Sequence, residues 1–346
     1  MSFVSARGRL TYARWAALVA LAATLATVVI LLAPLVGPGA DGHGVAVMSP
    51  RALWGGGVDG TIFWDVRLPR TLAAALVGAA LAAAGCAFQA VLRNPLADPY
   101  TLGVSSGASL GAVLAIRLGV ATLFGSAGVG AAAVLGALAA IALIWQIARV
   151  GVSLPPATVI LAGIAVSMTC AAASMLVFAT SDFAEMNRIL RWMMGGFEWT
   201  RLATVARALP FMIVGAAVLL WHGRDLNALT AGDEAAASVG VAVARTQTVV
   251  FLAASLLVGV SVSIAGPVGF VGLIVPHALR ALVGADHRAL LPLSCCAGAA
   301  MLVLCDTLTR IYIWLPVGGV TALAGGPFFL GLLVVGKRRG ALWQSA

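Results

Sequence analysis

A histidine and an arginine interrupt one of the long apolar runs of this chain. In the stretch FVGLIVPHALR, residues 270–280, the break comes at Pro276, His277 and Arg280. A histidine in such a run is compatible with a metal or heme ligand, a proton relay, or a residue at a helix end. The surrounding chain must decide among the three.

Two other polar pairs are spaced four residues apart, which places both side chains on one face of a helix. Gln89 precedes Arg93, and Asp306 precedes Arg310. A polar side chain at membrane depth faces either a partner helix or a water-filled path, and both alternatives stay open for Gln89. A mutual ion pair is the simplest interpretation of Asp306 and Arg310, because it lowers the cost of placing either charge near lipid.

Several other chemistries lack the residue patterns that they need. No series of acidic residues, histidines or lysines runs through the apolar segments, as a proton-coupled carrier or a redox enzyme would require, and no catalytic group of residues is recognisable. The five cysteines lie in apolar segments without C-x-x-C spacing, so neither a disulfide framework nor a metal site is predicted. Arg338 follows Lys337, the only lysine, which excludes a G-x-x-x-x-G-K-[ST] phosphate loop.

The composition indicates a membrane protein. Of 346 residues, 62% are hydrophobic and 10% charged, and the mean hydropathy is +1.05, which leaves too few polar residues to cover a water-soluble globule. The apolar segments are continuous rather than alternating, which excludes a barrel. At ~20 residues per crossing, we predict an all-α polytopic protein with about ten transmembrane helices, at residues 15–36, 70–92, 101–118, 122–148, 156–178, 203–222, 245–265, 268–283, 289–312 and 318–336.

The basic residues predict the orientation in the membrane. The net charge of +9 is scattered over segment ends rather than gathered on one face, so it marks topology and not nucleic-acid binding. Arginines precede the first apolar segment, which is longer than a signal-peptide core, so the N-terminus is predicted to be cytoplasmic. Ten crossings return the chain to the same side, so the C-terminus is predicted to be cytoplasmic too. This orientation places 12 of the 21 basic residues inside. The polar connection 223–244 is then cytoplasmic and is predicted to form short helices, with a solvated linker as the alternative.

Small residues predict close helix packing in the second segment. Gly78, Ala82 and Gly85 recur at helical spacing, which lets another helix approach the backbone. The same helix must end at the sequence NPLADP, because Pro95 and Pro99 cannot continue it.

Four long motifs together resemble one family. They are RLPRTLAAALVGAALAAAGCAFQAVLRNPLADPYTLGVSSGA (67–108), LNALTAGDEAAASVGV (226–241), GPVGFVGLIVPHALRALVGADHRALLP (266–292) and LPVGGVTALAGGPFFL (315–330). In this order they closely resemble the permease subunits of ABC importers for ferric siderophores, heme and cobalamin.

The resemblance implies a single permease domain over residues 1–346 in the bacterial inner membrane. It further implies a homodimer with the substrate path on its two-fold axis, two cytoplasmic ATPase subunits that bind ATP and Mg, and a periplasmic binding protein. The chain itself would be neither an enzyme nor the holder of a cofactor or metal. An ion-gradient-driven secondary carrier is the alternative.

The resemblance also implies roles for particular residues. The implied cytoplasmic gate is Asn94 and Leu96. Gln89 is the candidate for the translocation path because of its polarity at membrane depth, not because of the resemblance. Residues 226–241 would be coupling helices that contact the ATPase through Gly232, Asp233, Glu234, Ala235 and Gly240. Binding-protein docking is assigned to Arg67, Arg70 and Arg310, with helix-end anchoring and pairing to Asp306 as the alternative.

The cargo and the histidine are assigned last. Arg188 and Arg191 on the connection 179–202 are candidate contacts for the propionates of heme, which is slightly favoured as cargo, or for an anionic chelate; topology or packing is the alternative. His277 and Arg280 come at the cytoplasmic end of their segment, where basic groups complement the helix dipole. His277 is therefore interpreted as structural or close to the coupling surface.

Overall fold

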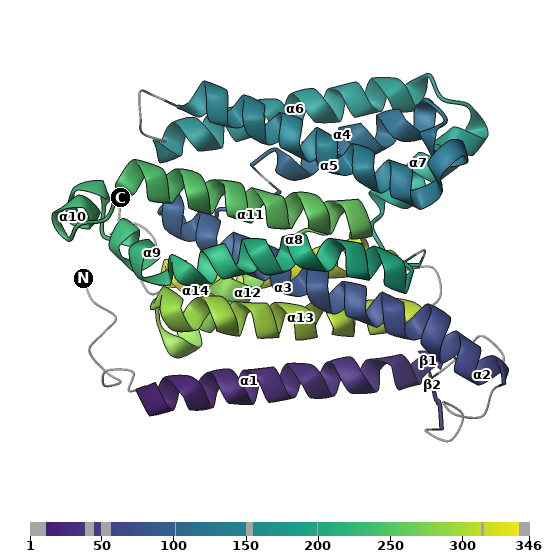
Figure 1. Cartoon of the computed structure of the whole chain (residues 1–346), viewed down its shortest axis with the longest axis horizontal. Helices are drawn as coiled ribbons and strands as arrows, with labels where there is room; N and C mark the ends of the chain where they lie inside the picture. The colour runs from purple at the N-terminus through teal and green to yellow at the C-terminus, as the bar shows by residue number, and fades with distance from the viewer. Residues whose placement is uncertain are drawn as a thin grey trace.

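The computed structural model describes residues 12–38, 45–49, 57–100, 102–149, 155–198, 200–312 and 315–338. Within these residues, seven helices are long and apolar enough to cross a membrane, and three shorter helices are also apolar. The all-α polytopic fold is as predicted, and the long helices lie side by side in one bundle (Figure 1).

Each of the ten predicted segments coincides with a helix. The helices are α1 (Tyr12–Leu32), α3 (Leu68–Val91), α4 (Val104–Arg117), α5 (Val120–Ala148), α6 (Pro156–Ala179), α8 (Leu202–Trp221), α11 (Val243–Ala265), α12 (Val271–Val283), α13 (His287–Ile311) and α14 (Val317–Arg338).

Short elements gather at the two ends of the bundle (Figure 1). The predicted cytoplasmic end carries α9 (Gly223–Thr230) and α10 (Asp233–Ser238). The opposite, outer end carries η1 (Ala33–Leu35), β1 (Val36–Pro38), β2 (Val45–Val47), α2 (Val58–Thr61), the π-helix η3 (Ile62–Arg67) and α7 (Phe183–Met193). The two strands pair antiparallel, with Val36 opposite Val47.

Helix α3 is the centre of the bundle and packs against α11, α12 and α13. Its small residues allow this: Gly78 lies against the backbone of Gly298 in α13, and Gly85 against that of Gly272 in α12, so closely that a Cβ on either would overlap the facing carbonyl. The close packing predicted from the small residues is therefore confirmed.

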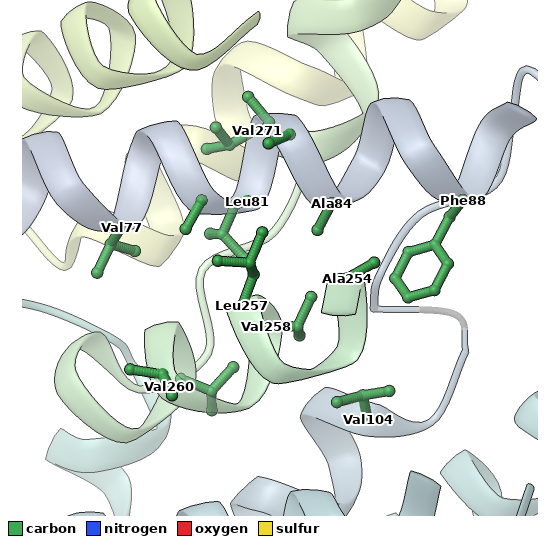
Figure 2. Close-up of a cluster of buried hydrophobic side chains, with 14 of the residues drawn as sticks. Val77, Leu81, Ala84, Phe88, Val104, Ala254, Leu257, Val258, Val260 and Val271 are labelled. Atoms are coloured by element: carbon green, nitrogen blue, oxygen red, sulfur yellow. The ribbon is translucent and has the colours of Figure 1, made fainter. Parts of the chain in front are cut away.

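Apolar side chains form a core between α3 and α11. Figure 2 shows Val77, Leu81 and Phe88 of α3 next to the valine, leucine and alanine side chains of α11. The rings of Phe88 and Phe251 meet edge to face with centroids 5.7 Å apart, a favoured aromatic geometry. This core fixes α3, and thereby both ends of α3, relative to α11.

The structure differs from the sequence-based segments at three places. The second helix begins earlier, because α2 and η3 continue into α3 without a break from Val58. Helix α5 is interrupted at Gly125, whose φ of 61° is outside the helical region. Helix α7 was not predicted, because it is amphipathic rather than apolar. Its start carries a capping-box signal, in which Asp182 accepts from the Glu185 backbone N–H and Glu185 from that of Asp182.

Candidate functional site

A cavity of about 2170 Å³ opens at the outer end of the bundle, between α5, α7, α8, α11 and the π-helix. This outer cavity is larger than the roughly 300–1,000 Å³ of pockets for drug-sized ligands. Much of its wall is apolar. The charged residues on the wall are Arg67, Arg70, Arg188, Arg191, Arg207 and Arg310, with Asp59 and Glu198. Six cationic groups therefore line the cavity with two anionic ones. The Asp306 carboxylate pairs with Arg70 and Arg310, and the remaining balance still leaves the cavity electropositive.

The three predicted docking arginines meet at one side of this cavity. Asp306 has no exposed side-chain area, and its Oδ1 accepts from Nε of Arg70 at 2.6 Å. Nε of Arg310 lies 3.3 Å from the other carboxylate oxygen, and the Arg310 side chain is only 6% exposed. Arg67 donates to the carbonyl oxygens of Pro34 and Leu35 at 3.3 and 3.4 Å.

The ion pair predicted for Asp306 and Arg310 is thus present, and Arg70 joins it from α3. These contacts match the helix-end and pairing alternative for the arginines. Their docking role stays a prediction.

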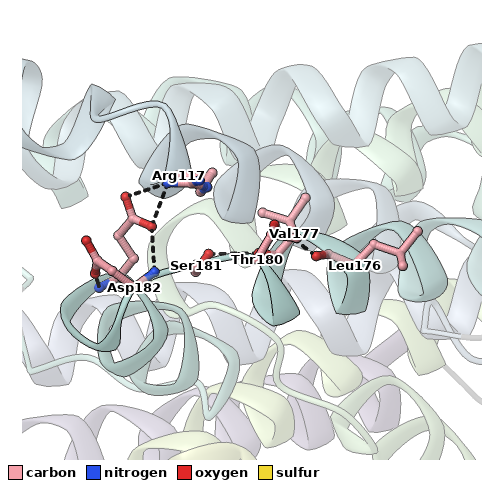
Figure 3. A network of polar contacts seen from close by, with 7 residues as sticks. Arg117, Leu176, Val177, Thr180, Ser181 and Asp182 are labelled. Carbon is pink, nitrogen blue, oxygen red and sulfur yellow. Dashed lines mark hydrogen bonds and ion pairs between the residues drawn. The ribbon is translucent and has the colours of Figure 1, made fainter.

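Helix α7 holds Arg188 and Arg191 on the wall of the outer cavity. Both side chains are exposed, and Arg191 donates to Oδ1 of Asn187 at 2.9 Å. An ion pair between Arg117 of α4 and Glu185 of α7, 2.9 Å long, fixes the start of this helix. Figure 3 shows Arg117 beside that start, next to the hydrogen bonds that end α6. The cargo contact stays a prediction.

Residues 94–97, here called the gate turn, follow the cytoplasmic end of α3. The Asn94 carbonyl accepts from the Ala97 N–H at 3.0 Å, and Oδ1 of Asn94 accepts from the Leu96 N–H at 2.9 Å. Pro95 fits the second position of such a turn. Leu96 is exposed at its tip. Just after the turn, burial raises the pKa of the Asp98 carboxyl to about 6. A backbone hydrogen bond involving Tyr100 has the smaller, opposite effect on this pKa.

The predicted coupling segment 226–241 forms α9 and α10, as helices rather than as a linker. Glu234, Ala235 and Gly240 are exposed, and Gly232 is half-buried with a φ of 115°. Asp233 differs from Glu234, because its Oδ1 accepts from Nη2 of Arg93 at 2.8 Å and from Nε2 of Gln247 at 3.1 Å. Contact of this segment with an ATPase stays a prediction.

Gln89 lies between α3 and α12. Its side chain is 3% exposed. Nε2 donates to the Gly272 carbonyl at 3.3 Å, and Oε1 accepts from Arg280 at 3.0 Å. Of the two alternatives, the structure places Gln89 against a partner helix, and its place on the translocation path stays a prediction.

His277 lies edge to face with Phe328, the ring centroids 6.3 Å apart. The described residues contain no group of three or more His, Cys, Asp or Glu side chains that could hold a metal. The ring contact fits the structural interpretation of this histidine.

Comparison with known proteins gives a consistent result. The model of the FecCD transport family matches residues 25–335. The uncharacterized ABC transporter permease protein YvrB of Bacillus subtilis is 43% identical over 285 residues, which cover 81% of this chain and 80% of that protein. The cobalamin import system permease protein BtuC of Halobacterium salinarum is 45% identical over 273 residues, 79% of this chain and 73% of that one.

A hemin transporter and a solved structure are also similar. The hemin transport system permease protein HmuU of Yersinia pestis is 37% identical over 317 residues, 88% of this chain and 93% of that one. The inward-facing structure of a metal-chelate type ABC transporter superimposes with a TM-score of 0.79 and 31% identity, covering 93% of this chain and 99% of that chain.

Proposed function

Since the chain belongs to the FecCD transport family and is a permease subunit of an ABC importer, we propose that two copies of it form the path for a metal chelate across the bacterial inner membrane. Two cytoplasmic ATPase subunits drive the step, and a periplasmic binding protein delivers the cargo. The observation that carries this proposal is the outer cavity of about 2170 Å³. The sequence contains no G-x-x-x-x-G-K-[ST] phosphate loop, so in this proposal ATP is bound and hydrolysed by the partner chain.

The two ends of the bundle have separate roles in this proposal. At the cytoplasmic end, the gate turn closes the path with Asn94 and Leu96, and the exposed face of α10 with Glu234 and Ala235 seats on the ATPase. At the outer end, Arg67, Arg70 and Arg310 receive acidic residues of the binding protein. Electrostatic complementarity of this kind acts mainly on orientation and association rate.

We propose an anionic chelate, and heme in particular, as the cargo. The names of relatives support cobalamin and hemin, and the charge of the outer cavity favours the second of these. Six arginines against two acidic residues on the wall favour a ligand with carboxylates, which pair well with guanidinium groups. The propionates of heme meet that requirement.

The function is tested by uptake into proteoliposomes. We expect the permease, reconstituted with its ATPase and binding protein, to accumulate cargo only when ATP and Mg are present. Uptake without the ATPase subunit, driven by an imposed ion gradient, would instead establish the secondary carrier.

The cargo is tested with the double variant Arg188→Gln and Arg191→Gln. We expect half-maximal stimulation of ATP hydrolysis to need about two- to thirtyfold more heme, because each exposed pair contributes about 0.2–1 kcal/mol. The response to cobalamin should stay unchanged in the same assay.

Arg201→Gln is the matched control, because Arg201 is exposed near the same end but lies outside the cavity wall. It should behave like the wild type. Equal loss of the heme and cobalamin responses in the double variant would contradict recognition of carboxylates by α7.

A further inference from the structure

We propose that the ion pair between Arg93 and Asp233 connects the ATPase-facing helix α10 to the gate turn, so that Arg93 is a positioning residue for the gate. The inference rests on the proposed function, since it takes the gate at residues 94–97 and the coupling role of α10 from there. The inference adds the contact through which a movement of α10 reaches the gate turn.

The backbone at Arg93 is the first observation. Its φ is 49°, and Arg93 and Phe270 are the non-glycine residues with positive φ in the described part of the chain. The Arg93 N–H donates to the Ala90 carbonyl, and the Asn94 N–H to the Gln89 carbonyl at 3.1 Å. This is the helix-ending motif in which the left-handed position normally belongs to glycine. An arginine there strains the backbone, and its side chain makes a contact that glycine could not make.

The side chain supplies a bridge between three elements. Nη2 of Arg93, at the end of α3, donates to Oδ1 of Asp233 at 2.8 Å. The same oxygen accepts from Nε2 of Gln247 in α11 at 3.1 Å, and Gln247 is buried. Asp233 is the first residue of α10. A displacement of α10 therefore acts directly on the guanidinium group of Arg93.

The gate turn moves with Arg93 because it is internally bonded. The turn follows Arg93 without an intervening residue, and the two hydrogen bonds to the carbonyl and side chain of Asn94 hold its shape. Pro95 removes a further degree of backbone freedom. A shift of Arg93 is thus transmitted to Leu96 at the tip rather than absorbed within the turn.

The pair contributes little to folding. The side chains of Arg93 and Asp233 are 33% and 42% exposed, and exposed ion pairs stabilise proteins only slightly. The strained arginine is therefore not explained by stability. What the pair does provide is a direct contact between the end of α3 and the first residue of α10.

The test uses Arg93→Gly in the reconstituted transporter with its ATPase and binding protein. Glycine relieves the left-handed strain, so we expect the melting temperature to stay equal or rise. Uptake per ATP hydrolysed should nevertheless fall roughly two- to thirtyfold, the range for residues that modulate coupling between sites. Arg93→Lys should retain most of the uptake per ATP, since lysine keeps the charge.

A charge swap and a cross-link separate this role from a merely structural one. Arg93→Asp alone places two acidic groups together and should uncouple strongly, and adding Asp233→Arg should restore uptake per ATP. With Leu96→Cys, cross-linking between the two subunits should depend on nucleotide in the wild type and lose that dependence with Arg93→Gly. Unchanged uptake per ATP in Arg93→Gly, or no rescue by the swap, would overturn the inference. Transport by the wild type without ATP would overturn the proposed function instead, so the two failures are distinguishable.

Discussion

Replacing Asp306 with asparagine is expected to destabilise the folded permease by about 3–5 kcal/mol, the usual cost of removing one partner from a buried ion pair. Asp306 has no exposed side-chain area and lies between the guanidinium groups of Arg70 and Arg310. Asparagine has nearly the same shape but no charge, so it leaves Arg310, itself 6% exposed, without its counter-charge.

The free energy of unfolding of detergent-solubilised protein measures this effect. Glu185→Gln is the matched control, because it makes the same carboxylate-to-amide change in the exposed pair with Arg117. Glutamine still serves the capping box, so about 0–1 kcal/mol should be lost. Adding Arg310→Met to Asp306→Asn should recover part of the lost stability, because burying an apolar side chain there costs less free energy than burying an unpaired charge. An Asp306→Asn variant as stable as the control would contradict the buried-pair interpretation.

The cluster of Asp306, Arg70 and Arg310 was predictable from the sequence only in part. The pair of Asp306 and Arg310 follows from the four-residue spacing alone, because a helix brings such side chains together. Arg70 is 236 residues away from Asp306 in the chain, and only the packing of α3 on α13 makes them neighbours. Spacing within a helix is a local property, whereas contact between helices depends on the whole bundle.

The helices and strands were likewise predictable only in part. Long apolar segments were predictable as helices because each must satisfy its own backbone hydrogen bonds in lipid. Helix α7 and the paired strands β1 and β2, apart from Val36 at the start of β1, lie outside the apolar segments, so hydropathy carries no signal for them. For α7, the Asp182 and Glu185 capping box was the available signal.

The candidate site was also predictable only in part. The resemblance to a family gave the gate turn and the coupling segment as separate motifs. The bond between Arg93 and Asp233, and the gathering of six arginines on one cavity wall, depend on side-chain positions that no motif encodes.

Leucine in place of Gly85 is expected to prevent α3 and α12 from packing and to leave almost no folded permease. A Cβ at position 85 would overlap the backbone of Gly272, and backbone atoms cannot turn aside as a flexible side chain can. Overpacking of a core by extra methylenes costs about 1–3 kcal/mol. Alanine should fall in this range and leucine beyond it.

The displaced carbonyl also has a function in the structure. The Gly272 oxygen accepts from Gln89, which in turn accepts from Arg280, so moving α12 breaks both bonds along with the helix contact. Size-exclusion profiles and melting in detergent measure the outcome. Gly331→Ala in α14 is the control, because no atom of the described residues lies within 4 Å of the added Cβ, and alanine at a helical position should be neutral or stabilising by up to ~1 kcal/mol. If Gly85→Leu yielded protein that melts like this control, α3 and α12 would not be in backbone contact, and Gly272 could not be the acceptor that holds Gln89 in place.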